Sequence, residues 1–216
     1  PDSKKVATFQ QDERNVGEMY LVETKAGHPV LKSWKYPLPG DAVVAMLHRV
    51  VIDTETGAMV RFKMGPDFHR AMLGDDFSVR DMIWSPDGSK LAFVSTARDH
   101  KKATVRLADT ATGEVRTVFE ETEKTHFESP AGWKILWATN EIIWNSQRDN
   151  WSHLYLYDLN SGALKNQITS GEGPVMSIDR VDEKARTVTF NANGREAGQD
   201  PYLSHYYRVG LDGKGY

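Results

Sequence analysis

Short apolar runs that end in an acidic residue, continue through polar residues and reach a glycine recur along the chain. The clearest examples are residues 20–23 with Gly27, 50–53 with Gly57, 106–109 with Gly113 and 155–158 with Gly162, and a shorter version covers residues 209–213. An acidic side chain can accept hydrogen bonds from the backbone amides of a turn, and glycine adopts the positive φ that a tight reversal needs. The pattern therefore predicts β-hairpins.

The spacing of these hairpins indicates a repeated unit. The glycines at 57, 113, 162 and 213 lie 56, 49 and 51 residues apart, whereas Gly27 precedes Gly57 by only 30. A period near 50 is typical of propeller blades. Further strand-like runs at 82–84, 90–94, 141–144 and 187–190 bring the count to four strands a period, and the Ser-Pro-Asp-Gly turn at 85–88 joins two of them.

These patterns predict an all-β fold of β-propeller blades, each with four antiparallel strands, and very little helix. We expect residues 1–216 to form one partial propeller domain of about four blades. Blade ends are expected near residues 30, 62, 119 and 169, with a last partial blade reaching 216. Residues 63–80 are expected to be irregular, because Gly and Pro interrupt any pattern there. A closed four-bladed propeller fits the period but would leave both end blades incomplete.

Composition narrows the class of function. The formal net charge is −3 and no block of Lys and Arg gathers anywhere, which argues against a nucleic-acid partner. Cysteine is absent, so disulfides and thiolate metal sites are excluded. The seven histidines lack metal-site spacing, and we expect no metal, no cofactor and no membrane contact from this segment. The start at Pro1 suggests a piece of a longer protein.

Several longer strings resemble one family. They are Lys35-Tyr36-Pro37-Leu38-Pro39-Gly40-Asp41, Asn145-Ser146-Gln147-Arg148-Asp149-Asn150-Trp151-Ser152-His153-Leu154-Tyr155-Leu156-Tyr157-Asp158 and Gln167-Ile168-Thr169-Ser170-Gly171. These strings, with the blade-like Trp84-Ser85-Pro86-Asp87-Gly88, are similar to the N-terminal propeller of dipeptidyl-peptidase-IV-like serine peptidases of the prolyl oligopeptidase superfamily, in their bacterial form. The resemblance covers nearly the whole chain and is weakest over residues 63–80.

The resemblance implies an eight-bladed propeller, of which this chain is about half, capping an α/β-hydrolase domain that the 216 residues do not include. The parent protein would be a serine-type dipeptidyl peptidase that releases N-terminal dipeptides with Pro or Ala in second position. Peptide substrates would be its partners, through the missing hydrolase domain. Its location would be the bacterial periplasm or envelope, although the compartment does not follow from this segment.

No catalytic residue is expected in this chain, because the nucleophile elbow Gly-x-Ser-x-Gly is absent. The family holds the substrate's ammonium group with two adjacent glutamates, but Glu120 and Glu121 fall too late in the sequence for that pair, which favours a solvated charge cluster. His126, Phe127 and Glu128 resemble the family segment that reaches over the substrate pocket. We therefore predict these three as residues of the pocket rim.

The sequence leaves two functions open. The first is a non-catalytic propeller segment that gates substrate access in the peptidase, inactive by itself. The alternative is a freestanding periplasmic propeller that acts as a protein- or ligand-binding scaffold. For the fragment, unpaired blade faces also predict self-association.

Overall fold

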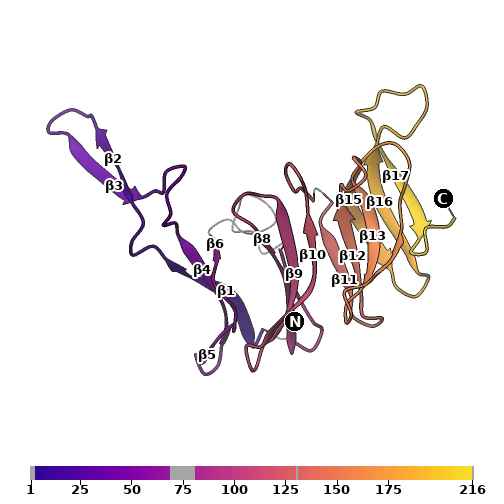
Figure 1. Ribbon diagram of the computed structural model, residues 1–216, viewed down its shortest axis with the longest axis horizontal. Helices are drawn as coiled ribbons and strands as arrows, with labels where there is room; N and C mark the ends of the chain where they lie inside the picture. Colours follow the sequence, from indigo (N-terminus) through magenta and orange to yellow (C-terminus); the bar gives the residue numbers. More distant parts are fainter. Residues whose placement is uncertain (1–2, 69–80, 130, 216) are drawn as a thin grey trace.

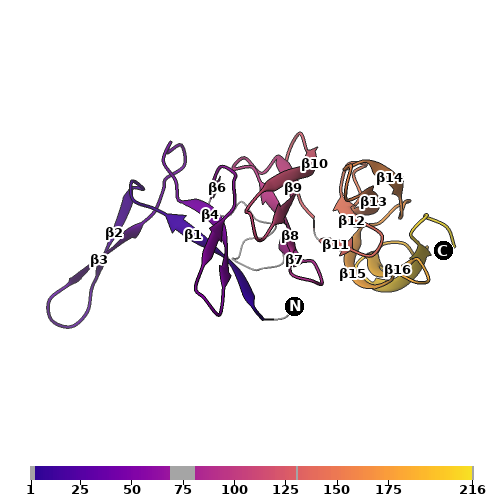
Figure 2. The same cartoon turned by 90° about the horizontal axis from the view of Figure 1, so that it is seen from below.

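A computed structural model describes residues 3–68, 81–129 and 131–215, and their strands form four antiparallel sheets and one separate hairpin (Figure 1). No α-helix occurs among the described residues, in agreement with the sequence. The first three sheets follow one another in chain order along the long axis of the molecule, and the fourth lies beside the third (Figure 2). The all-β fold class with blades of antiparallel strands is therefore confirmed. Within the predicted irregular segment, residues 69–80 lie outside the described residues.

The first sheet carries a long insertion. It contains β1 (Lys5–Asp12), β4 (Met46–Asp53), β5 (Met59–Arg61) and β6 (Asp67–Phe68). Since β1 pairs along the whole of β4, β5 and β6 share the other edge of β4. Between β1 and β4 the chain forms the hairpin of β2 (Glu18–Glu23) and β3 (Val30–Lys35), which projects away from the sheets as an arm (Figure 1). The predicted blade end near residue 30 falls inside this arm.

The other three sheets are built from consecutive strands. The second contains β7 (Met82–Trp84), β8 (Lys90–Thr96), β9 (Lys102–Asp109) and β10 (Val115–Thr122), and the third contains β11 (Trp133–Leu136), β12 (Glu141–Ser146), β13 (His153–Asp158) and β14 (Leu164–Gln167). The fourth contains β15 (Val175–Asp182), β16 (Thr187–Asn193) and β17 (Ser204–Gly210). The four strand-like runs of the sequence coincide with β7, β8, β12 and β16.

The predicted turns have the expected chemistry. Asp53, Asp109 and Asp158 each accept backbone N–H groups from the second and third residues that follow, at 2.7–3.0 Å. These backbone hydrogen bonds lower the pKa of all three carboxyl groups. The glycine that closes each turn has a φ between 71° and 74°. The hairpin pattern of the sequence thus corresponds to one turn that recurs in successive sheets.

The turn glycines also set the contact between neighbouring sheets. A Cβ added at three of them would strike the outer strand of the preceding sheet: Gly113 at 2.6 Å from the Arg61 carbonyl oxygen, Gly162 at 1.9 Å from that of Val118, and Gly213 at 2.9 Å from that of Gln167. At Gly57 no described atom lies within 4 Å of the same position. Glycine is therefore required for both its φ and its lack of a side chain where two sheets meet.

Apolar clusters fill the spaces between successive sheets, and the third sheet is buried on both faces. Ile142 of β12 packs with Val105 against the second sheet, while the adjacent Ile143 packs with Phe190 against the fourth. Every residue of β12 is buried. Because alternate residues of a strand face opposite ways, a sheet between two neighbours needs apolar side chains on both faces. This explains why β12 and β13 each contain an uninterrupted apolar run, residues 142–144 and 154–157.

His153 fastens the crossover between the third and fourth sheets. Its ring is buried, and Nε2 lies 2.9 Å from the Gly171 carbonyl oxygen, which can only accept a hydrogen bond. In neutral histidine, Nδ1 is then the acceptor for the Thr169 hydroxyl at 3.1 Å. Arg195 Nη2 lies 3.5 Å from Nδ1, and Asp149 Oδ2 lies 3.9 Å from Nε2. The ring is thus held as the neutral tautomer, as a hydrogen-bonding partner and not a metal ligand.

Acid should weaken the fold through His153. Burial lowers the pKa of this imidazole in spite of the opposing effect of Asp149. As the pH falls below the unfolded-state value of about 6.5, the unfolded chain binds the proton first, so stability is lost towards acid pH. We expect the free energy of unfolding to fall less between pH 7 and pH 5 in His153→Gln than in the wild type. Urea titrations measure this, and His28→Gln on the exposed arm should leave the wild-type slope intact.

Candidate pocket-rim site

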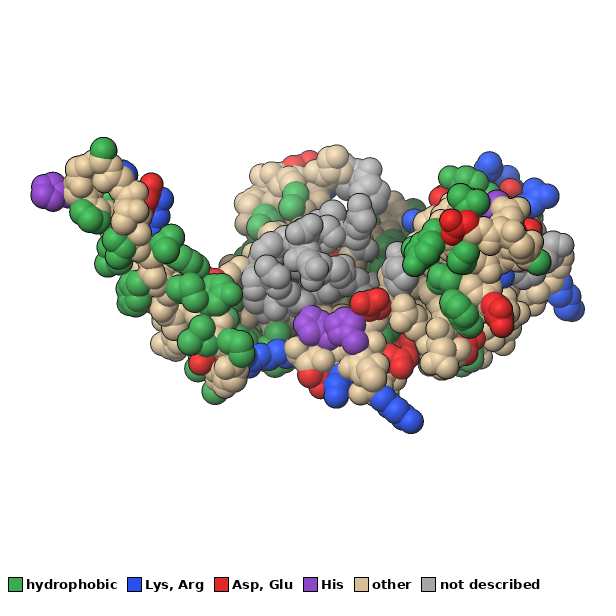
Figure 3. Space-filling view, turned by 90° about the horizontal axis from the view of Figure 1, so that it is seen from above, with side chains coloured by type: hydrophobic (Ala, Val, Ile, Leu, Met, Phe, Trp, Pro, Cys, Tyr) green, Lys and Arg blue, Asp and Glu red, His purple; other side chains and the backbone are tan. Residues whose placement is uncertain are grey.

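One end of the sheets gathers the residues predicted for the rim. The linker 123–132 leaves β10 at this end, and the turns 97–101 (β8 to β9) and 147–152 (β12 to β13) lie at the same end, opposite the Asp-to-Gly turns. Figure 3 views the molecule from this side and shows histidine side chains near the middle of the face. The ring centroids of His100 and His126, from the first turn and the linker, lie 5.3 Å apart.

The three predicted rim residues have different surroundings. Phe127 is 6% exposed, its ring stacks on Trp144 at 5.9 Å, and its backbone N–H donates to the His100 carbonyl at 2.6 Å. His126 and Glu128 are exposed on either side of it, with Nε2 and Oε1 3.7 Å apart. The buried ring of Phe127 anchors the linker, which leaves the imidazole and the carboxylate available to a ligand.

Glu120 and Glu121 point to opposite faces of β10. Glu120 is partly exposed and accepts hydrogen bonds from Thr104 at 2.9 Å and Lys102 at 3.3 Å. Glu121 is buried towards the third sheet. The expectation of a solvated charge cluster is therefore right for Glu120 and wrong for Glu121. Successive side chains of a strand diverge, so these two carboxylates are not arranged to grip a single ammonium group.

Glu121 lies at the centre of a buried polar network that the sequence did not reveal. Its carboxylate accepts hydrogen bonds from Trp144 Nε1 at 2.9 Å, Ser146 Oγ at 2.6 Å and Arg148 Nη2 at 2.5 Å. Arg148 Nη2 also donates to the Tyr157 hydroxyl at 2.6 Å. Burial acts to lower the pKa of Arg148, but the Tyr157 hydrogen bond and the charge of Glu121 outweigh it, so the pKa is raised. Arg148 therefore stays charged.

The turns at this end repeat between sheets. Arg98-Asp99-His100 and Arg148-Asp149-Asn150 lie 50 residues apart, and the third residue of each has a left-handed φ, 55° at His100 and 72° at Asn150. In both turns this residue's N–H donates to the carbonyl three residues earlier at 2.9 Å. The repeated Arg-Asp pair was the available sequence signal for the network, because it marks equivalent turns.

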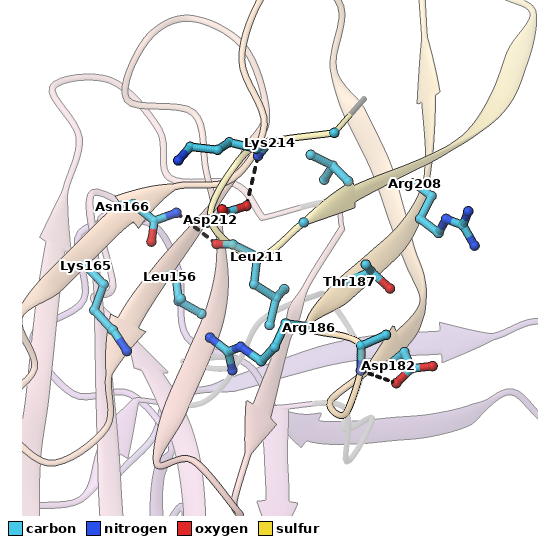
Figure 4. A pocket seen from close by; sticks show the side chains of 14 residues that line it. Leu156, Lys165, Asn166, Asp182, Arg186, Thr187, Arg208, Leu211, Asp212 and Lys214 are labelled. Carbon is cyan, nitrogen blue, oxygen red and sulfur yellow. Dashed lines mark hydrogen bonds between the residues drawn. The ribbon is translucent and has the colours of Figure 1, made fainter.

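One cavity between the blades lies away from the rim. It has a volume of about 800 Å³ and opens between the third and fourth sheets near the Asp-to-Gly turns (Figure 4). Asn166 donates to the Leu211 carbonyl at 2.9 Å beside it. The cationic groups of Lys165 and Arg186, which help to line it, both pair with Glu141. Burial acts to raise the pKa of Glu141, but the hydrogen bonds from Arg186 and Lys165 outweigh it and lower the pKa to about 2. Their charge is therefore already balanced by a protein carboxylate.

Within residues 3–68, 81–129 and 131–215, no group of three or more His, Asp or Glu side chains is arranged to hold a metal ion. The same residues include no helix with the length and apolar character of a membrane span.

Comparison with known proteins identifies the family. The model of the dipeptidyl peptidase IV (DPP IV) N-terminal region matches residues 1–216, the entire chain. The chain belongs to this family. As a member of the DPP IV N-terminal family, it is a portion of the propeller of such a protein, and its four sheets are blades.

Two solved structures resemble this DPP IV N-terminal chain. One is a protein assigned as a dipeptidyl aminopeptidase IV from Bacteroides ovatus, with a TM-score of 0.80 and 23% identity over 98% of this chain and 31% of that one. The other is Porphyromonas gingivalis dipeptidyl peptidase 4, with a TM-score of 0.75 and 19% identity over 99% of this chain and 29% of that one. At this identity the likeness shows the fold. The chain spans about a third of the length of these relatives.

Proposed function

We propose that the chain is a non-catalytic propeller segment that gates and shapes substrate access in a DPP-IV-like serine exopeptidase. The observation that carries this is the family match over residues 1–216. The 216 residues contain no Gly-x-Ser-x-Gly motif, so the nucleophile would come from a separate hydrolase domain. The substrates would be peptides with Pro or Ala in second position. A propeller serves such an enzyme by walling off the reaction chamber, so that only a peptide end reaches it.

The test compares this chain with the longer protein that carries it. The longer protein should release p-nitroaniline from Gly-Pro and Ala-Pro p-nitroanilides and lose this activity with a serine-directed organophosphate. The 216-residue chain by itself should release none. A longer protein that folds but hydrolyses neither substrate would favour the alternative of a freestanding binding propeller. Turnover by the pure chain would contradict the non-catalytic assignment.

We propose that His126 and Glu128 contribute to the rim of the substrate pocket and that Phe127 anchors them. Both exposed side chains lie on one linker, at the end of the blades opposite the Asp-to-Gly turns. In the longer protein, Glu128→Gln should change KM for peptide substrates several-fold, on the order of one lost charge-assisted contact, with little change in kcat. Glu55→Gln, on an exposed turn at the other end of the blades, is the matched control. Equal KM values for the two variants would remove Glu128 from the rim.

We also propose that the chain self-associates, with the β2–β3 arm as the contact surface. Tyr20, Val22 and Leu31 share one face of the arm, since Val22 pairs with Leu31 and Tyr20 follows the same alternation. All three side chains are more than half exposed. An exposed two-stranded ribbon with free edges offers both apolar surface and unpaired backbone groups.

Light scattering tests this association. The mass should rise above that of a monomer as the concentration increases, and Val22→Glu/Leu31→Glu should reverse the rise, whereas Met59→Glu outside the arm should not. A wild-type monomer at all concentrations would contradict self-association.

A further inference from the structure

The carboxylate of Glu121 is engaged on both oxygens by three donors from the neighbouring sheet. Oε2 accepts from Trp144 Nε1 and Arg148 Nη2, and Oε1 accepts from Ser146 Oγ. The side chain is 7% exposed. A charged group in such a position is stable only when it is fully hydrogen-bonded, and each donor then has a fixed direction. Glu121 therefore orders its donors and is not presented to a ligand.

The first of these donors leads directly to the rim. The indole N–H of Trp144 is aimed at Glu121, which sets the plane of the ring, and Phe127 stacks on that ring with an interplanar angle of 23°. Phe119 meets the same indole edge-on at 5.4 Å. Phe127 lies between His126 and Glu128 in the linker. The orientation of Trp144 thus sets the position of Phe127, and Phe127 holds His126 and Glu128 in place.

Arg148, another of these donors, connects Glu121 with the adjacent turn. Arg148 belongs to the turn 147–152, its Nε donates to Ser146 Oγ at 2.8 Å, and its guanidinium lies 4.2 Å from the ring centroid of Tyr155. It reaches Glu121 from the side of this turn, whereas Trp144 reaches it from within β12. The Glu121 carboxylate therefore connects Trp144, on which the linker packs, with the turn 147–152.

We propose that Glu121 is a positioning residue for the rim: through Trp144 and Phe127 it fixes the linker that carries His126 and Glu128, and through Arg148 it fixes the turn beside it. The ordering of the linker stands on the contacts above. The effect on peptide substrates rests on the proposed function. Exchange of one carboxylate oxygen for an amide NH₂ removes the ion pair with Arg148 and turns a donor towards other donors, so the linker and the turn loosen together.

The test uses Glu121→Gln in the longer protein that carries this chain, with Glu120→Gln as the control. The two variants make the same chemical change at adjacent positions, one buried and one partly exposed. Hydrogen exchange read by mass spectrometry should accelerate roughly tenfold in the peptides covering 122–129 and 147–152 of Glu121→Gln, as expected for loss of one charge-assisted hydrogen bond. Glu120→Gln should exchange like the wild type. Unchanged exchange in Glu121→Gln overturns the proposal.

Kinetics separate this proposal from the function on which it partly rests. In an active peptidase, Glu121→Gln should raise KM for peptide substrates with kcat retained, since the rim meets the peptide and not the reacting bond. Faster exchange with an unchanged KM would overturn the effect on substrate. Faster exchange in a protein whose wild type hydrolyses no dipeptidyl substrate would refute the proposed function and leave the positioning role standing.

A second variant covers the case in which Glu121→Gln does not fold. Arg148→Gln leaves the Trp144 and Ser146 hydrogen bonds to Glu121 in place, and its side chain is 31% exposed, so the fold should tolerate it. Arg148→Gln should accelerate hydrogen exchange more strongly in 147–152 than in 122–129. Acceleration in 147–152 without any in 122–129 would show that the turn and the linker are not joined through Glu121, and would overturn the proposal.

Discussion

Replacing Gly162 with alanine should destabilise the protein far more than replacing Gly57. The two residues occupy the same position of the same turn, with φ values of 72° and 71°. The left-handed backbone costs an alanine about 1–2 kcal/mol at either site. At Gly162 the new Cβ would also lie 1.9 Å from the Val118 carbonyl oxygen, whereas at Gly57 no described atom lies within 4 Å. The second and third blades would have to separate to admit it.

We expect Gly57→Ala to lower the free energy of unfolding by about 1–2 kcal/mol and Gly162→Ala by at least about 4 kcal/mol, in the range of severe core defects. Guanidinium titrations of the two variants measure the difference. Gly213→Ala and Gly113→Ala should fall between them in that order, since their nearest carbonyl oxygens lie at 2.9 Å and 2.6 Å. Equal losses at all four sites would show that φ alone explains the glycines and that the approach of the blades does not.

Truncation of Arg49 should cause a comparably large loss of stability. This side chain is buried between the first two blades, where Nε donates to Asp67 at 2.7 Å and Nη2 donates to Asp81 at 3.0 Å and to the Val94 carbonyl at 2.9 Å. Its guanidinium lies 4.3 Å from the centroid of the Phe93 ring. Burial raises the pKa of Asp81 even with Arg49 present. Loss of the arginine would leave two carboxyl groups buried beside one another.

Arg49→Ala should therefore cost about 3–5 kcal/mol, the usual penalty for removing one partner of a buried ion pair. Arg14→Ala is the control, because Arg14 pairs with Asp12 at 2.6 Å on the exposed surface, where such a pair contributes little to stability. Urea titration at pH 7 measures both. A loss below about 1 kcal/mol for Arg49→Ala would mean that the cluster does not hold the two blades together.

Much of the fold could be predicted because the strands and turns of a blade depend on patterns of residues that are close in the sequence. The acidic residue and the glycine of each turn lie within five residues of one another, and strand alternation needs only a short window. For the same reason, the sequence predicted the hairpin of the arm but not that it stands apart from the blades. Its hairpin, with Gly27, has the local pattern of a blade turn, but β2 and β3 pair only with each other, and β1 finds its partner in β4. Pairing across that distance has no local signature.

The site shows the same division. The family resemblance identified residues 126–128 as candidates. Their place at the end of the blades opposite the Asp-to-Gly turns follows from the order of the strands. Whether each of these side chains faces solvent or the core depends on the side chains of the next blade. Phe127 is buried because its ring stacks on Trp144 of that blade. The resemblance also covered the string that contains Arg148, but it gave no reason to connect that residue with Glu121.

The strands, the turns, the repeat and the family resemblance follow from the sequence, because each depends on neighbouring residues or on their regular spacing. The packing of one blade against the next determines which of Glu120 and Glu121 is buried, and it brings another backbone close to Gly162 but not to Gly57. Both outcomes depend on the neighbouring blade, whose donors and carbonyl oxygens come from residues that are separated by 23 to 44 positions in the chain. Burial of a charge or a close approach of backbones is a property of such pairs, and no single stretch of sequence contains it.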